Sequence, residues 1–356
     1  MEELRFEKVT KKYGALVAVS DISLTVKPSE YIFILGPNAC GKSVLLRMIA
    51  GLEEPTSGEI FIKGVAVNKV PAYKRRIPVV FQNFALFPTM TVRDNIEYGL
   101  RIQGIAENEC RKRSDELLEM LGIQEMSEKK PAQLSAGQKQ RVGLGRALAI
   151  EPSILLLDEP LGALDAKLHI QMQFELKRIQ RLMGVTFIQV SHNHSDALAV
   201  ADRIVIMNAG AVEQVGTPKE IFTFPKSRFA AEILDNNNLI EGVVAGNEGK
   251  NTLVKTVLGD MVVSAGDHHP SAGTKVCIVV RQDRIQTNHH SLDNKVKAKI
   301  TGRTVKGSLV IYEFDAQRQT LKVERHLSAG LIDVSADEEF TLSWNAENSI
   351  LLPFES

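Results

Sequence analysis

Hydrophobic and polar positions change their spacing along the chain, and this change divides the chain into two parts. In the first part, short apolar runs alternate with stretches in which apolar positions recur at helical spacing. Residues 154–157 form an apolar run, a helical pattern follows over residues 164–179, and residues 186–190 form the next run. Strands that alternate with helices in this way are typical of parallel βαβ units. We therefore expect an α/β domain over residues 1–235.

The pattern changes near the run Asp235-Asn236-Asn237-Asn238, beyond which the long helical patterns end. Short strands with alternating apolar and polar residues follow, separated by Gly, Asn and Asp turns; three of them are residues 295–300, 321–324 and 340–344. Roughly 120 residues of this kind predict a small all-β barrel, or a pair of them, over residues 236–356.

The composition is that of an ordinary globular protein. Basic and acidic residues balance at 43 each, so charge provides no reason to expect nucleic acid as a partner. Three widely spaced cysteines, an odd number, favour a reducing compartment. The N-terminus lacks the apolar core of a signal peptide, and no apolar run approaches the roughly 18–20 residues that span a bilayer. We expect a cytosolic protein whose membrane role, if it has one, comes through a partner.

The segment GPNACGKS, residues 36–43, lies between the apolar run at 31–35 and a helical pattern that starts near Lys42. Gly-x-x-x-x-Gly-Lys-Ser is the phosphate-loop pattern, in which backbone N–H groups and a helix N-terminus surround a phosphate. Lys42 would neutralise β- and γ-phosphate oxygens, and the Ser43 hydroxyl would bind Mg²⁺. A strand-to-helix turn with a surface lysine is the alternative, but the placement between strand and helix favours the phosphate loop.

The apolar strand at 154–157 ends in two acids, Asp158 and Glu159. An acid at this point of a phosphate-loop protein holds Mg²⁺ through water, which suits Asp158. Glu159, one residue further on, can then point at a water in line with the γ-phosphate. Solvated acids at a strand end are the alternative, and the phosphate-loop pattern makes it the weaker of the two.

A third segment, LSAGQKQRVGLGRALA at residues 134–149, begins with a helix-capping pattern. Ser135 and Gln138 are spaced as a capping box, and a capped helix N-terminus is also an anion site. Gly143 and Gly145 each cost about 1 kcal/mol relative to alanine inside a helix, which indicates close packing there. The residues alone leave both readings, structural cap and anion site, open.

Together these segments make residues from about Leu4 to Pro218 resemble the ATP-binding subunit of ATP-binding-cassette (ABC) transporters. The motifs stand in the family's order and at its spacings, and residues 134–138 are similar to the family's signature Leu-Ser-Gly-Gly-Gln. The remaining matches are Tyr13, Gln82, the loop 161–165 and His192. The tail from about Asn236 is similar to the oligomer-binding (OB-like) β-barrel of many import ATPases, chiefly through the segment VRQDRI.

The resemblance implies ATP and Mg²⁺ as cofactors and a role for each matching residue. Tyr13 would stack on adenine, Gln82 would contact Mg²⁺ or the attacking water and sense the permease, and His192 would sense the γ-phosphate. The implied catalytic residues are Glu159, His192 and Gln82, and the implied Mg²⁺ ligands are Ser43, Gln82 and Asp158. The implied ATP contacts are Tyr13, Gly36, Pro37, Asn38, Ala39, Cys40, Gly41, Lys42 and Ser43 in one subunit, with Ser135, Gly137, Gln138 and Asp165 reaching from the other.

The implied protein is a homodimer that closes on ATP and opens after hydrolysis. A helical subdomain over about residues 83–150 would face an integral-membrane permease, and a periplasmic or surface solute-binding protein would deliver the solute. The subunit would be cytoplasmic and peripheral on the inner face of the cell membrane, with no nucleic acid as partner. The solute would be a sugar, a polyamine, ferric iron or an oxyanion.

Two positions depart from the family pattern, because Ala39 and Ala136 stand where the family usually has glycine. The methyl group of Ala39 raises the cost of a positive-φ conformation near the phosphate, whereas alanine is the better helix former at residue 136. We expect a tuned rate of hydrolysis rather than lost function. These departures keep open a poorly hydrolysing regulatory module; the other alternative is a soluble cassette ATPase not tied to transport.

Cys40 lies inside the phosphate loop, where two expectations are equally open. Backbone N–H groups and the helix N-terminus would lower the pKa of its thiol and favour a reactive thiolate. A small side chain that is buried against the core would instead be inert.

Overall fold

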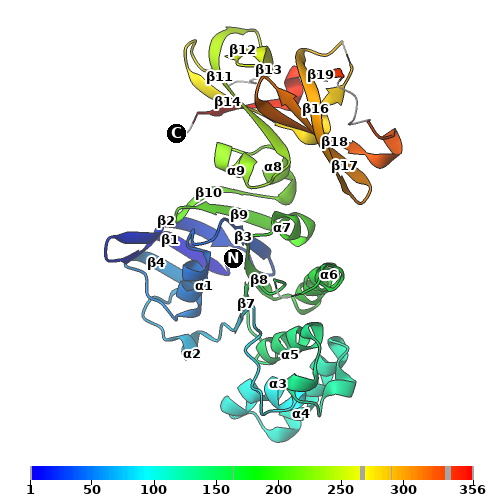
Figure 1. Ribbon diagram of the computed structural model, residues 1–356. Helices are drawn as coiled ribbons and strands as arrows, with labels where there is room; N and C mark the ends of the chain where they lie inside the picture. The colour runs from blue at the N-terminus through cyan, green and yellow to red at the C-terminus, as the bar shows by residue number, and fades with distance from the viewer. Residues whose placement is uncertain (1, 163, 265–268, 290, 333–337, 355–356) are drawn as a thin grey trace. The chain divides into compact units, whose positions relative to one another are not determined.

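The computed structural model of the chain describes residues 2–162, 164–264, 269–289, 291–332 and 338–354 (Figure 1). The chain divides into two units, Met1–Ile221 and Phe222–Ser356. The boundary expected from the sequence, after residue 235, lies 14 residues beyond that division (235 − 221), just before the first long strand of the second unit. None of the helices in the described part of the chain is long and apolar enough to cross a membrane.

A six-stranded sheet forms the centre of the first unit, with the order β10-β9-β3-β8-β7-β6. Five of these strands are parallel, and β10 joins the edge antiparallel. The strands expected at 154–157 and 186–190 are confirmed as β7 and β8. The strand bounds are β3 (Tyr31–Leu35), β6 (Val79–Val80), β7 (Ile154–Asp158), β8 (Thr186–Ser191), β9 (Arg203–Asn208) and β10 (Ala211–Gly216).

Helices follow the parallel strands as the sequence pattern predicts. The helix expected over residues 164–179 is α6 (Ala166–Met183), and it begins two residues later because the Asp165 side chain caps it by accepting from the Leu168 N–H. Other helices outside the lobe between β6 and β7 are α1 (Lys42–Ala50), α2 (Ala72–Arg75) and α7 (His194–Val200).

The first unit also contains an antiparallel sheet, which was not predicted from the sequence. Two of its strands come before β3 in the chain, and the other two lie between β3 and β6. Its order is β2-β1-β4-β5, formed by β1 (Leu4–Tyr13), β2 (Leu16–Val26), β4 (Ser57–Ile62) and β5 (Val65–Ala66). Phe6 and Ile22 of this sheet share one apolar core with Leu45 of α1 and Val190 of β8. The two sheets therefore enclose α1, the helix that starts at the phosphate loop.

A lobe of three helices lies between β6 and β7, within the range of about 83–150 expected from the sequence: α3 (Val92–Ile102), α4 (Glu107–Met120) and α5 (Ala136–Leu148) (Figure 1). The close packing expected at the glycines of α5 is confirmed. A Cβ atom on Gly145 would lie 2.9 Å from a methyl group of Leu121, and one on Gly143 would lie 3.4 Å from Cβ of Phe84.

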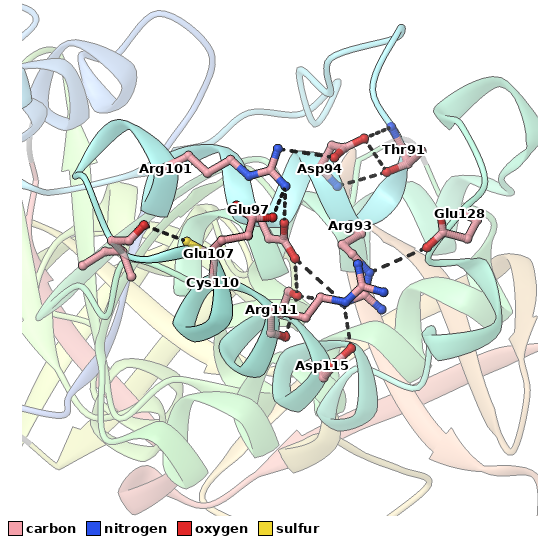
Figure 2. Close-up of polar contacts among 12 residues, drawn as sticks. Thr91, Arg93, Asp94, Glu97, Arg101, Glu107, Cys110, Arg111, Asp115 and Glu128 are labelled. Carbon is pink, nitrogen blue, oxygen red and sulfur yellow. Dashed lines mark hydrogen bonds and ion pairs between the residues drawn. The ribbon is translucent and has the colours of Figure 1, made fainter.

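A buried polar network holds α3 and α4 of this lobe together (Figure 2). Glu97 is 0% exposed, and its carboxylate accepts from the Ser114 hydroxyl at 2.6 Å and from Arg101 at 2.7 Å. Arg93 on α3 also bonds Asp115 on α4 at 2.7 Å. A buried carboxylate is costly unless it is paired in this way, so the network makes the two helices depend on each other.

The second unit is all-β apart from short helices, as the sequence predicts. Two five-stranded sheets share one core that contains Tyr312, Phe314 and Trp344. Along β16, Val296, Ala298 and Ile300 belong to this core while Lys297 and Lys299 between them are exposed, which is the expected alternation. The strands are β11 (Asn237–Glu248), β12 (Asn251–Thr256), β13 (Gly259–Ser264), β14 (Lys275–Arg281) and β20 (Ser349–Pro353) in one sheet, and β15 (Gln286–Thr287), β16 (Asn294–Lys306), β17 (Leu309–Ala316), β18 (Gln319–His326) and β19 (Glu339–Trp344) in the other. The short helices α8 (Pro218–Thr223) and α9 (Arg228–Glu232) precede them.

Candidate functional site

The phosphate-loop segment forms a tight turn between the end of β3 and the start of α1. A Cβ atom on Gly36 would lie 2.4 Å from the carbonyl oxygen of Met207, and one on Gly41 would lie 2.3 Å from that of Ala18. Gly41 also has φ of 105°, which only glycine adopts without strain. Both ends of the loop therefore require glycine because the backbone passes directly against neighbouring strands.

The N-terminus of α1 is open to an anion. No side chain caps it, and its first turn contains no acidic residue. Lys42 is 6% exposed, and its ammonium group donates to the carbonyl oxygens of Gly36 at 2.8 Å and Pro37 at 2.7 Å. A helix N-terminus with unsatisfied N–H groups and an adjacent buried cation is the arrangement that binds phosphate.

Ser43 and Asp158 bring two oxygen donors together beside the loop. The Ser43 hydroxyl donates to the Asp158 carboxylate at 3.4 Å. Burial raises the pKa of Asp158 above its usual value, although the hydrogen bond from Ser43 opposes this effect. Both residues, with Gln82 and Glu159, line a hollow of about 700 Å³. Hydroxyl, carboxylate and amide oxygens are the ligands Mg²⁺ prefers, and a cation there would offset the burial of Asp158.

Glu159 follows β7 in a left-handed conformation, with φ of 47°. This conformation is uncommon for a residue with a side chain, and it turns the chain sharply after Asp158. The Glu159 carboxylate lies 3.0 Å from Nδ1 of His192, which follows β8. The residues that directly follow two adjacent parallel strands therefore meet. One of them is Glu159, the residue that the sequence pointed to as facing the attacking water.

Tyr13 lies at the end of β1 with 42% of its surface exposed. It lines a hollow of about 310 Å³ together with Lys42 and Ala39. Leu16 and Ala18 of β2 line the same hollow, and the sequence analysis did not name them. Leu16 follows Tyr13 by three residues and is 66% exposed, and its place so near Tyr13 is the sequence signal that could have identified it. Ala39 has φ of 62°, so the positive-φ conformation expected for this position is confirmed.

Of the two expectations for the Cys40 thiol, the structure supports the buried one. Its side chain is 4% exposed and belongs to the apolar core that includes Leu45 and Val190. Burial raises the pKa of the Cys40 thiol, and the nearby Lys42 ammonium only partly opposes this. The expectation of a lowered pKa was wrong because desolvation outweighs the positive potential of the loop.

The signature segment forms the expected capping box at the start of α5. The Ser135 side chain accepts from the Gln138 N–H at 3.3 Å, and the Gln138 side chain accepts from the Ser135 N–H at 2.9 Å. The residues expected to act from the other subunit, Ser135, Gly137, Gln138 and Asp165, are not among the described residues that line the hollows at Tyr13, Ser43 and His192. Ala163 of the loop 161–165 lies outside the described residues.

Two further side chains from α5 support the site, and the sequence analysis missed both. Gln140 is buried and donates to the Pro160 carbonyl oxygen at 3.1 Å, next to Glu159. Arg146 donates to the carbonyl oxygens of Ala85 and Phe84 at 2.7 and 3.0 Å, just beyond Gln82. Both are long polar residues among apolar neighbours in a helix. This sequence pattern does not show which distant carbonyl oxygens the two side chains bond.

Comparison with known proteins identifies the family. The sequence profile described as ABC transporter matches residues 19–162. The spermidine/putrescine import ATP-binding protein PotA of Rubrobacter xylanophilus is 38% identical over 352 residues, which cover 98% of this chain and 93% of that protein. The chain belongs to the ATP-binding subunits of ABC transporters. It is an ATPase subunit of the importer type, which confirms the importer interpretation over the two alternatives.

Other proteins are similar to this ABC importer subunit over part of its length. The Fe(3+) ions import ATP-binding protein FbpC of Rhizobium etli is 44% identical over 250 residues, or 70% of this chain and 71% of that protein. Among solved structures, cbiO1 from Clostridium perfringens, part of the cbiONQ ABC transporter complex, has a TM-score of 0.60 at 31% identity and covers 63% of this chain and 91% of that chain. A dimeric post-hydrolysis ATP-binding cassette bound to ADP and Pi has a TM-score of 0.54 at 34% identity, covering 60% and 98%.

Proposed function

We propose that this ABC importer subunit hydrolyses MgATP with Glu159 as the residue that activates the attacking water. The observation that carries the proposal is that three hollows meet at Glu159. The first includes Lys42 and Tyr13, the second includes Ser43 and Asp158, and the third includes His192. A carboxylate at this junction can accept a proton from water beside a bound phosphate.

The other residues of the site bind and orient the nucleotide. In this proposal the ATP contacts are Tyr13 at the adenine and residues 36–43 at the phosphates, including Lys42 as the cation for the β- and γ-oxygens. Ser43, Gln82 and Asp158 would hold Mg²⁺, which supplies further neutralisation of the phosphate charge. His192 contacts Glu159 and would orient its carboxylate while sensing the γ-phosphate.

The active form that we propose is a homodimer. Ser135, Gly137, Gln138 and Asp165 would reach the nucleotide bound by the second copy. The start of α5 supports this role, because its first turn contains no acidic side chain that would repel an anion. ATP bound by both copies would stabilise the closed dimer, and hydrolysis would release it.

In the cell, the subunit would lie in the cytoplasm, peripheral on the inner face of the membrane. The lobe formed by α3, α4 and α5 would face an integral-membrane permease, and Gln82 would transmit its state to the site. A periplasmic or surface solute-binding protein would act on the other side of the membrane, and we assign no nucleic acid to the complex.

For the solute, we propose a polyamine. The support is that the Rubrobacter xylanophilus relative, named for spermidine/putrescine import, matches along both units of this chain. Ferric iron is the second candidate, since the relative named for Fe(3+) import is similar over 70% of the chain.

The test is to copurify the chain with its permease, add the solute-binding protein, and measure ATP hydrolysis in vesicles. Spermidine or putrescine should stimulate hydrolysis several-fold over the solute-free rate, and ferric iron should not. Stimulation by ferric iron alone would replace polyamine with the second candidate. An E159Q complex is the control, because any stimulation that survives in it cannot arise at this site.

A further inference from the structure

A histidine–aspartate pair outside the residues discussed so far joins two helices that begin at the site. Nε2 of His169 lies 2.7 Å from Oδ1 of Asp196. His169 is in the first turns of α6 and Asp196 is in the first turn of α7. The loop before α6 ends at Asp165, and the segment before α7 contains His192. The pair therefore connects the loop expected to reach the other subunit with the histidine that contacts Glu159.

Short, hydrogen-bonded paths connect each member of the pair to these loops. The backbone N–H of His169 donates to the Asp165 carbonyl oxygen at 2.8 Å. On the other side, the Asn193 side chain caps α7 by accepting from the Ser195 N–H at 2.9 Å, and His192 precedes that cap directly. A shift of His169 relative to Asp196 is therefore a shift of one loop relative to the other.

The pair is buried enough for its hydrogen bond to matter. Asp196 is 4% exposed, and the His169 side chain is 20% exposed. Gln173 of α6 donates to the same Asp196 oxygen at 3.4 Å. A buried carboxylate depends on such donors, and a charge-assisted hydrogen bond is about twice as strong as a neutral one.

The pair shares a hollow of about 210 Å³ with the site. Glu159 and His192 line it together with His169 and Asp196. These are the titratable groups that face the pair from the segments after β7 and β8 and from α7. From β3, the buried phenol of Tyr31 faces Asp196; burial raises the pKa of Tyr31, and the Asp196 charge contributes.

We infer that His169 and Asp196 are positioning residues for ATP hydrolysis. This inference rests on the proposed function of Glu159 and His192. The hydrogen bond from His169 satisfies a carboxylate that is only 4% exposed, so it holds the start of α6 against the start of α7. Loss of this contact lets the loop at Asp165 and the segment at His192 move relative to each other.

The test compares His169→Arg, which keeps a cation at every pH, with His169→Gln, which keeps only a neutral donor. ATP hydrolysis by the purified full-length chain is measured at one pH, 7.5. His169→Arg keeps a charged donor to Asp196 and should retain kcat within about twofold of the parent. His169→Gln should lower kcat about threefold with little change in KM, since the phosphate-loop contacts remain.

Two controls separate positioning from a loss of stability. Lys177 on the same helix pairs with Asp202 at 2.7 Å but does not line the hollow, so Lys177→Gln should leave kcat unchanged. Asp196→Asn should lower kcat as His169→Gln does, and the double variant should lose no more than either one. Melting temperatures check that all variants are folded.

A kcat for His169→Arg as low as that of His169→Gln would overturn the inference, as would parental kcat in both His169→Gln and Asp196→Asn. Failure of the proposed function looks different. In that case the parent itself would hydrolyse ATP no faster than E159Q.

Discussion

Glu159 and His192 are 33 residues apart in the chain (192 − 159), yet the carboxylate of one lies 3.0 Å from the imidazole of the other. They come from the ends of adjacent parallel strands, β7 and β8. The contact places the proposed proton acceptor and the residue proposed to orient it at the junction of the hollows around the phosphate loop.

Replacing Glu159 with Gln keeps the size of the side chain and its hydrogen bonding but removes its charge. Turnover of MgATP should fall by roughly 10²–10⁴-fold, the range for a lost general base, while ATP still binds. An ATP-bound dimer should accumulate, which size-exclusion chromatography measures. Near-parental turnover would show that another residue activates the water.

Lys42 and Ser43 should differ in their effects on binding. Lys42→Ala removes the buried ammonium beside the loop, so ATP affinity should fall about 10- to 100-fold even without Mg²⁺. Ser43→Ala should weaken binding in the presence of Mg²⁺ and leave binding in metal-free buffer nearly unchanged. Titration of both variants with a fluorescent ATP analogue measures this, and parental affinity in both would reduce residues 36–43 to a structural turn.

The two alanines that replace family glycines should respond oppositely to restoring glycine. Ala39 has φ of 62°, so Ala39→Gly should relieve strain and raise the free energy of unfolding of the first unit by about 0.5–1 kcal/mol. Ala136 begins α5, so Ala136→Gly should lower the free energy of unfolding by up to about 1 kcal/mol. Chemical denaturation measures both, and equal signs would contradict the backbone argument. ATPase rates of the same proteins show how far each methyl group tunes hydrolysis.

Cys40 should react slowly with thiol reagents in the folded protein at pH 7. Burial raises its pKa, so the thiol stays protonated at neutral pH, and the thiolate fraction grows only as pH rises beyond the range of an ordinary cysteine. The rate of labelling should therefore keep increasing with pH where an exposed thiol levels off. Cys40→Ser identifies which labelling event belongs to this residue. Rapid labelling at pH 7 that is missing in Cys40→Ser would mean that the sulfur is open to solvent.

Glu97 should be required for the stability of the helical lobe. Glu97→Gln removes a carboxylate that is 0% exposed and weakens its bonds from Ser114 and Arg101, so it should cost about 1–3 kcal/mol of unfolding free energy. Glu128 pairs with Arg93 at 3.7 Å, but its side chain is 75% exposed, so Glu128→Gln should cost less than about 0.5 kcal/mol. Urea unfolding of the full chain, monitored by a signal from the first unit, compares the unfolding free energies of the two variants. Equal costs would indicate that solvent reaches Glu97.

Structural features that depend only on residues close together in the chain were predictable from the sequence alone. The phosphate loop, the cap formed by Ser135 and Gln138, and the alternation along β16 each depend on spacings of a few residues, and such spacings specify local backbone conformation. The order of strands and helices predicted the α/β unit and the all-β unit for the same reason. The roles of Tyr13, Gln82 and His192 came instead from resemblance to a family.

Contacts between residues that are distant in the chain depended on the tertiary structure. The sequence left the direction of the Cys40 side chain open, and its burial in the core that includes Leu45 and Val190 decided it, because desolvation outweighed the field of the loop. The pairing of His169 with Asp196 likewise requires α6 and α7 to lie side by side against the sheet. Sequence spacing specifies which way a residue faces on its own helix or strand, but only packing determines what it meets there.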